Sequence, residues 1–192
     1  QSHPFPVALA IHEDPIKPTH LLRRGDVLTP GAEVQPSLPA ILGLPSPAIV
    51  PPDNRPATSG RRLAFARWMS HPQHPLTARV LVNRIWQHHF GTGIVGTANN
   101  FGAKGDQPSH PGLLDWLAKQ FIANEGRTKS LHRLIVMSKA YRRSSAHPEP
   151  KVLNAVDPTG KLLASFRPRR LTAEELRDAI LLVTGELNPE MG

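Results

Sequence analysis

Apolar residues recur at helical spacing through most of the chain beyond residue 60. At 100° per residue, one stripe between residues 109 and 126 gathers Leu113, Leu114, Trp116, Leu117 and Phe121. The same periodicity, interrupted at proline and glycine, predicts five helices. They cover residues 61–70, 75–90, 109–126, 130–141 and 172–185.

Start and stop residues accompany these helices. Pro75 suits a first helical turn, and Gly91 suits the position after a helix because glycine adopts a positive φ without strain. Ser109 is placed to cap the third helix, and Thr172 with Glu175 has the spacing of a capping box for the fifth. Local signals therefore delimit the predicted helices.

The first sixty residues follow a different pattern. Twelve of the 21 prolines lie there, and proline lacks the N–H donor that helix interiors and central strands need. Short apolar runs at residues 7–11 and 21–22 predict brief strands, and the residues Thr-Pro-Gly-Ala at 29–32 are typical of a type II turn. From residue 36 to residue 56 we expect extended chain.

Together these patterns predict a mainly α protein, with a five-helix body and an extended, proline-rich N-terminal arm that holds the short strands. The expected domains are the arm, residues 1–60, and the helical body, residues 61–192.

Charge follows the same division. The chain carries a formal net charge of +8, and residues 61–192 hold 19 basic and 10 acidic residues, a net charge of +9. We therefore expect the body to attract polyanions. The chain has no cysteine, which excludes disulfides, cysteine-based zinc sites and covalent haem attachment in this segment. No apolar run approaches the roughly 18 residues that a membrane span needs.

Eight short blocks occur in order along the body. They are PLTARV at 75–80, VNRIW at 82–86, HFG at 89–91, PSHP at 108–111, LDWL at 114–117, LHRLI at 131–135, YR at 141–142 and RRLTAE at 169–174. With these blocks the chain resembles the PSD-type C-terminal domain of unknown function in large exported planctomycete-type proteins, whose N-terminal parts carry c-type cytochrome domains. LRRGD at 22–26, followed by Pro30 and Gly31, fits the same family.

The resemblance implies an exported protein, periplasmic or at the cell surface, with a preceding region that can hold c-type haem and a continuation beyond Gly192. It implies no established reaction. Because the chain lacks cysteine, we expect no cofactor in this segment itself. Other domains of the same polypeptide are the expected partners.

The chain also departs from the family pattern. The usual aspartate before Phe-Gly is Asn100, the usual acidic residue after Ser-His-Pro is Gly112, and the usual Gly-Trp-Ser is replaced at 126–128. Two carboxylates are therefore absent where an acid–base pair would be sought, which weakens an enzymatic interpretation.

A glycine motif at residues 91–96 matches G-x-G-x-x-G. Dinucleotide binding requires this motif to follow a strand and open a helix, so that helix N–H groups meet the pyrophosphate. Here a predicted helix precedes the motif. We interpret the segment as a helix end and a loop.

Arg79 and Asn83 lie on the apolar side of the second predicted helix, where polar groups need partners. They have two interpretations. One is an anion or glycan site, with the candidates Arg79, Asn83, Arg84 and His110. The other, which we favour, is an internal polar network in which Arg79 pairs with a carboxylate such as Asp115 or Asp178 and Asn83 bonds to loop backbone.

Histidines are frequent, at positions that include His71, His74, His88, His89, His110 and His132. Their spacing lacks the helical His-Glu-x-x-His or Glu-x-x-His arrangement, so we predict no metal site. Ser109, His110 and Asp115 have the residue types of a catalytic triad. A neighbouring serine and histidine rarely face each other as nucleophile and base, however.

Three functions remain. The first is an uncharacterised module of a cytochrome-associated protein that docks onto other domains or binds an anionic surface polysaccharide, without chemistry of its own. The second is a subdomain of an enzyme acting on sulfated polysaccharide, with Arg79, Asn83, Asp106 and His110 near one cleft. The third, nucleic-acid binding, rests on charge alone and is disfavoured because few aromatic residues accompany the basic ones.

Overall fold

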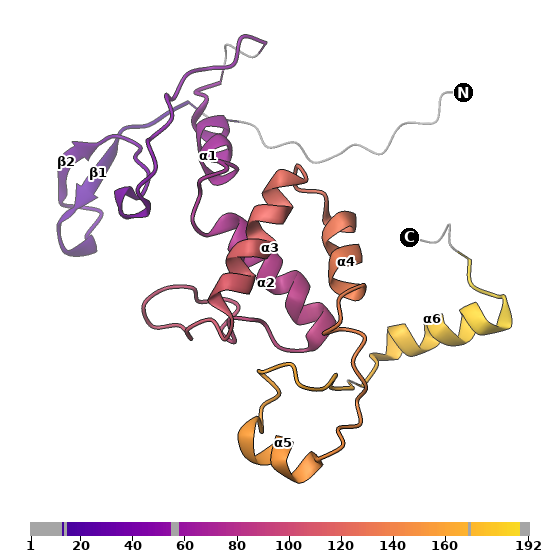
Figure 1. The fold of residues 1–192 in the computed structure, drawn as a ribbon. Coiled ribbons are helices and arrows are strands. Elements are labelled where there is room, and N and C mark those ends of the chain that lie inside the picture. Colours follow the sequence, from indigo (N-terminus) through magenta and orange to yellow (C-terminus); the bar gives the residue numbers. More distant parts are fainter. Residues whose placement is uncertain (1–12, 14, 55–57, 169, 189–192) are drawn as a thin grey trace, which may run out of the picture. The chain divides into compact units, whose positions relative to one another are not determined.

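The computed structural model describes residues 13, 15–54, 58–168 and 170–188 (Figure 1). The described residues form six α-helices and one two-stranded sheet, which confirms the prediction of a mainly α protein. The chain divides into two compact units, Gln1–Thr77 and Ala78–Gly192. The domain boundary expected at residue 60 from composition stays a prediction.

The first unit contains a β-hairpin. β1 (Thr19–Leu22) pairs antiparallel with β2 (Pro30–Val34), with Thr19 opposite Val34 and a bulge between His20 and Leu22. A short 3₁₀ helix, η2 (Ala40–Leu42), follows. The strand expected at residues 21–22 thus lies at the end of β1, whereas the strand expected at residues 7–11 lies outside the described residues.

The turn predicted at residues 29–32 is wrong. Pro30 pairs with Leu22 as the first residue of β2, and Gly31 lacks the positive φ that a type II turn requires. The chain turns earlier, at η1 (Arg23–Gly25), where Arg24 and Gly25 have φ of 53° and 77°. The Asp26 carboxylate fixes the return by accepting a 2.9 Å hydrogen bond from Leu28 N.

The same unit holds α1 (Arg61–Met69). Its Trp68 is buried and makes an edge-to-face contact with the ring of His74, with ring centroids 4.6 Å apart. His74 Nδ1 accepts a 3.1 Å hydrogen bond from Thr77 N, the first residue of α2. A histidine therefore caps the next helix, a role that neither periodicity nor Pro75 predicts.

Three helices build the core of the second unit (Figure 1): α2 (Thr77–Phe90), α3 (Pro111–Ala123) and α4 (Thr128–Val136). Val82, Leu117 and Ile135, one from each helix, are essentially inaccessible to solvent. Burial of their apolar surface holds the three helices together. Trp116, expected in the buried stripe of α3, is 46% exposed.

Several predicted helix ends differ from the structure: α2 begins at Thr77 and not at residue 75, α3 ends at Ala123 and not near residue 126, and α4 begins at Thr128 and not at residue 130. Ser109 does not cap α3, because its hydroxyl donates to Ile94 O at 3.2 Å instead. α4 ends at Val136 rather than near Tyr141, where Ser138 Oγ accepts from Tyr141 N at 3.2 Å. Such local side-chain bonds compete with continuation of a helix.

The last two helices lie outside this core. α5 (Pro150–Val156) was not expected, and its seven residues are too few for a clear periodic pattern. α6 (Ala173–Thr184) has the predicted Thr172–Glu175 capping box and ends at Gly185, with φ of 77°. No helix in the described part of the chain is long and apolar enough to cross a membrane.

Candidate functional site

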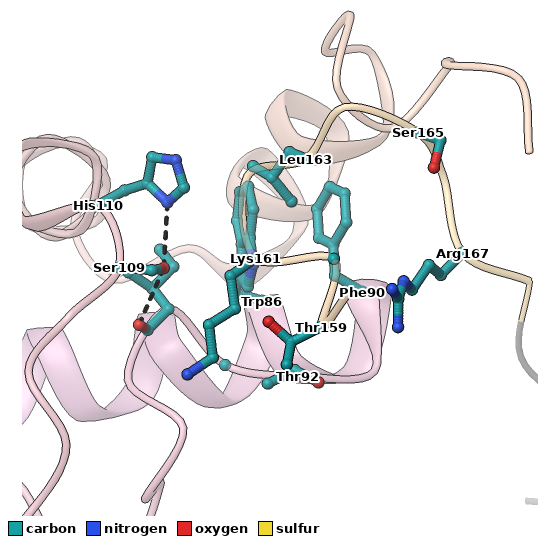
Figure 2. A pocket seen from close by; sticks show the side chains of 13 residues that line it. Trp86, Phe90, Thr92, Ser109, His110, Thr159, Lys161, Leu163, Ser165 and Arg167 are labelled. Atoms are coloured by element: carbon teal, nitrogen blue, oxygen red, sulfur yellow. Dashed lines mark hydrogen bonds between the residues drawn. The ribbon is translucent and has the colours of Figure 1, made fainter. Parts of the chain in front are cut away.

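A pocket of about 90 Å³ lies within the second unit, at the C-terminal end of α2 (Figure 2). The end of α2, the loop after it, the turn before α3 and the loop after α5 enclose it. The lining residues are Trp86, Phe90, Thr92, Gly93, Ile94, Ser109, His110, Thr159, Gly160, Lys161, Leu163, Ser165 and Arg167.

Asn83 fixes the loop after α2. Its buried side chain donates from Nδ2 to Val95 O at 3.0 Å, and its Oδ1 accepts from Val95 N at 2.8 Å. Gly93 has to be glycine, because a Cβ there would lie 2.7 Å from Asn83 Nδ2. This clamp holds the segment with Thr92, Gly93 and Ile94 against α2, where it forms part of the pocket wall.

The turn before α3 is tied to the same loop. Ser109 donates twice to Ile94 O, from its backbone N at 2.9 Å and from Oγ at 3.2 Å. His110 Nδ1 lies 3.1 Å from Ser109 Oγ, as the dashed lines in Figure 2 show. These neighbouring side chains therefore contact each other, but the Ser109 hydroxyl directs its one hydrogen to Ile94 O and not to His110.

The loop after α5 carries the two cations of the pocket. The buried carboxylate of Asp157 accepts from Lys161 N and from Leu162 N, each at 2.8 Å, which sets the path of the backbone. Arg167 Nη2 donates to Pro158 O at 2.6 Å. The guanidinium lies over Gly160, where a Cβ would approach Nε to 2.2 Å and φ is 69°.

The charged side chains in the pocket lining are all cationic. Its thirteen residues include Lys161 and Arg167 but no aspartate or glutamate. Within the described part of the chain the exposed Lys161 ammonium has no hydrogen-bond partner. In the view of Figure 2 it lies on one side of Thr159 and the Arg167 guanidinium on the other. Cations combined with hydroxyl groups suit an oxyanion.

The pocket does not assemble an acid–base set. Ser109 and His110 touch, but a nucleophile–base pair needs a third group to orient the base, and Asp115 is held elsewhere by Arg79. Asp106, expected near the cleft, is not in the lining, and its carboxylate lies against Gly96. Among the described residues no group of three or more His, Asp or Glu side chains could hold a metal ion.

Of the site residues predicted from sequence, Arg79 and Asp115 of the polar network bond to each other. Arg79 Nε donates to Asp115 Oδ1 at 2.6 Å, and this hydrogen bond, with the charge of Arg79, holds the pKa of Asp115 below its usual value. Arg84 donates to Asn99. Asp178 is exposed on α6 and has no ion pair within the described ranges. Of the anion-binding candidates Arg79, Asn83, Arg84 and His110, the pocket is lined by His110 alone.

Sequence analysis did not single out the polar residues that complete the lining: Thr92, Thr159, Lys161 and Ser165. The segment after α5 has no periodic pattern that would place it against α2. The sign of its charge was the available signal, because Lys161 and Arg167 belong to the basic excess of residues 61–192.

The comparisons with known proteins give a family and no activity. No curated protein and no solved structure matches the chain. The family model PSD1, described as "Protein of unknown function (DUF1553)", matches residues 61–192, which is more than half of the chain. This match confirms the resemblance carried by the sequence blocks between residues 75 and 174. The chain belongs to the PSD1 family.

Proposed function

We propose that the chain is a binding module that takes an anionic group of a polymer into the pocket at the end of α2 and carries out no reaction of its own. One observation carries this proposal: the lining holds Lys161 and Arg167, four hydroxyl side chains and no carboxylate. An anion that enters gains charge-assisted hydrogen bonds and meets no like charge in the lining.

The size of the pocket limits what can enter. A volume of about 90 Å³ is several times the roughly 10–15 Å³ that holds one water molecule on the same measure. Pockets for whole small molecules are several times larger, about 300–1,000 Å³. A single sulfate or carboxylate group therefore fits, and the rest of the polymer would lie on the basic surface outside.

The aromatic residues of the pocket favour a polysaccharide over a nucleic acid. Single-stranded nucleic acids bind to aromatic rings that present a free face to the bases. Trp86 is buried and one face of its ring stacks on Phe90 with centroids 4.1 Å apart, so Trp86 offers no free face to a base. The proposed ligand is a sulfated or carboxylated polysaccharide.

The proposed setting follows from the family resemblance. In an exported protein whose other domains can carry c-type haem, a surface polysaccharide is an accessible polyanion. Docking onto those neighbouring domains is the second use we propose for the basic body.

The test compares two lysine variants of equal charge change. Dextran sulfate, uncharged dextran and duplex DNA are titrated into the parent chain, Lys161→Gln and Lys151→Gln at about 150 mM salt. Lys151 is exposed on α5, outside the pocket lining. Loss of a charge-assisted contact in the pocket should weaken dextran sulfate binding about tenfold in Lys161→Gln. The change in Lys151→Gln should be about twofold or less.

Several outcomes would contradict the proposal. Equal weakening in both variants would mean that binding depends on overall charge and not on the pocket. Tighter binding to DNA than to dextran sulfate would favour the nucleic-acid alternative. Release of inorganic sulfate during incubation with the parent chain would support the enzymatic alternative instead.

A further inference from the structure

Two histidines from different helices meet on the surface of the second unit. His89 lies near the end of α2 and His132 lies on α4. Nε2 of His89 is 2.8 Å from Nδ1 of His132, and the two ring centroids are 5.0 Å apart with the ring planes inclined by 68°. The two residues are 43 positions apart in the chain. Their spacing in the sequence therefore gave no sign of a pair.

The surrounding packing holds both rings in place. The rings of His89 and Tyr141 make an edge-to-face contact, with centroids 5.6 Å apart and planes at 89°. On α4, Leu131, the neighbour of His132, is buried in the core, as is Ile135 one turn further on. The backbones that carry the imidazoles are thus fixed by the core, while the His132 side chain stays accessible to ions from solvent.

The geometry of the pair is close to that of a chelate. In the hydrogen-bonded state one of the facing nitrogens carries a proton and the other accepts it. Movement of that proton to the opposite nitrogen of its own ring leaves two lone pairs directed at one region, without net loss of a proton. With metal–nitrogen bonds of about 2.0–2.1 Å in a tetrahedral arrangement, the nitrogens would stand about 3.3 Å apart. Rotation of the exposed His132 side chain can supply the half ångström of separation.

We propose that His89 and His132 form a two-imidazole site for Zn²⁺ or Cu²⁺ that links α2 to α4. Imidazole nitrogen suits these borderline cations, whereas Mg²⁺ and Ca²⁺ require oxygen ligands. Water or a ligand of another molecule would complete the coordination shell. The proposal is independent of the anion pocket, because neither histidine lines it.

The test uses the untagged full chain, because an affinity tag would add histidines. Zn²⁺, Cu²⁺ and Mg²⁺ are titrated into the parent, His89→Gln, His132→Gln and the control His88→Gln, with calorimetry and thermal unfolding as readouts. His88 is the exposed neighbour of His89 on the same helix. Since one imidazole cannot chelate, each variant of the pair should bind Zn²⁺ and Cu²⁺ more than about tenfold more weakly than the parent. His88→Gln should bind as the parent does.

A second readout needs no variant. The electron paramagnetic resonance spectrum of the parent with one equivalent of Cu²⁺ should show coupling to two imidazole nitrogens. Circular dichroism of each metal-free variant checks that the fold is retained. Parent-like Zn²⁺ affinity in His132→Gln, coupling to a single nitrogen in the parent, or an equal rise in melting temperature with Mg²⁺ would each overturn the proposal.

Discussion

Asn83 shows how one buried polar residue organises the pocket. Both polar atoms of its side chain bond to the backbone of Val95, and neither residue has appreciable contact with solvent. The apolar face on which Asn83 lies indicated that it needs partners. Position alone did not identify Val95 as the partner.

Asn83→Ala should lower the free energy of unfolding by about 2–4 kcal/mol. The variant leaves the N–H and C=O of Val95 buried without partners, which costs about 1–3 kcal/mol, and it adds a small cavity. Urea denaturation measures the difference. The exposed Asn154→Ala serves as the control and should remain within about 0.5 kcal/mol of the parent. Equal stability of the two variants would refute the clamp.

His74 makes stability depend on pH. Burial, with the nearby His71 adding its charge, lowers the pKa of His74 in the folded chain. Its Nδ1 already accepts from Thr77 N, so protonation there would remove the cap of α2. In the unfolded chain His74 titrates near its ordinary value of about 6.5. As pH falls below that value the unfolded state binds a proton that the folded state does not, and stability decreases.

His74→Asn should flatten this dependence, because asparagine offers an oxygen to the helix terminus but does not titrate. The free energy of unfolding is measured between about pH 7 and pH 5 for both chains. The parent should lose up to about 1.4 kcal/mol per pH unit more than the variant in the window between the unfolded and folded pKa values. Identical pH dependence would show that His74 is not the group responsible.

At the scale of elements, α6 forms from local signals and not from burial. Its capping box and terminal glycine are present, yet none of its residues is buried, and Val183 is 88% exposed. The apolar stripe that predicted the helix is therefore uncovered by the described part of the chain. Helix formation and helix packing are decided by different interactions in this segment.

Thr172→Ala should destabilise α6 locally by about 1 kcal/mol, since it removes the bond from Glu175 N to the threonine hydroxyl. Amide exchange in α6 should accelerate about fivefold, while the melting temperature of the chain stays unchanged because α6 lies outside the core. Thr184→Ala, at the other end of the same helix, is the matched control. A fall in global melting temperature for Thr172→Ala alone would mean that α6 contributes to the core after all.

At the scale of the whole molecule, burial is uneven. The core residues of α2, α3 and α4 are inaccessible to solvent, whereas β1 and β2 contain no buried residue. A segment with few buried apolar contacts unfolds locally at low free-energy cost, whereas a core segment is exposed only when the whole unit unfolds.

Native-state amide exchange should therefore be slowest at Val82, Leu117 and Ile135 and fastest in the hairpin. The measurement is mass spectrometry or NMR of the intact chain in deuterated buffer. Protection of β1 and β2 equal to that of the three core residues would show that the hairpin is part of one cooperative unit.

The sequence by itself determined the class of the fold, the approximate positions of five of the six helices, and the family. The limits that were right depend on interactions between near neighbours, such as the glycine after α2 and the Thr172–Glu175 box, whereas Pro75 lies before the first turn of α2 and not within it. Where local alternatives competed, as at Ser109 and Ser138, the prediction of a helix end was wrong.

Only the tertiary structure decided which side chains meet. Arg79 bonds to Asp115, 36 positions away. Asp178 has the same charge and was an equal candidate from the sequence, but it stays exposed. The pocket joins α2 to a loop some seventy residues later, and the His89–His132 pair joins two helices. Charge and periodicity in the sequence indicate whether a residue needs a bonding partner. Its partner depends on how the apolar faces pack, because that packing brings distant segments together.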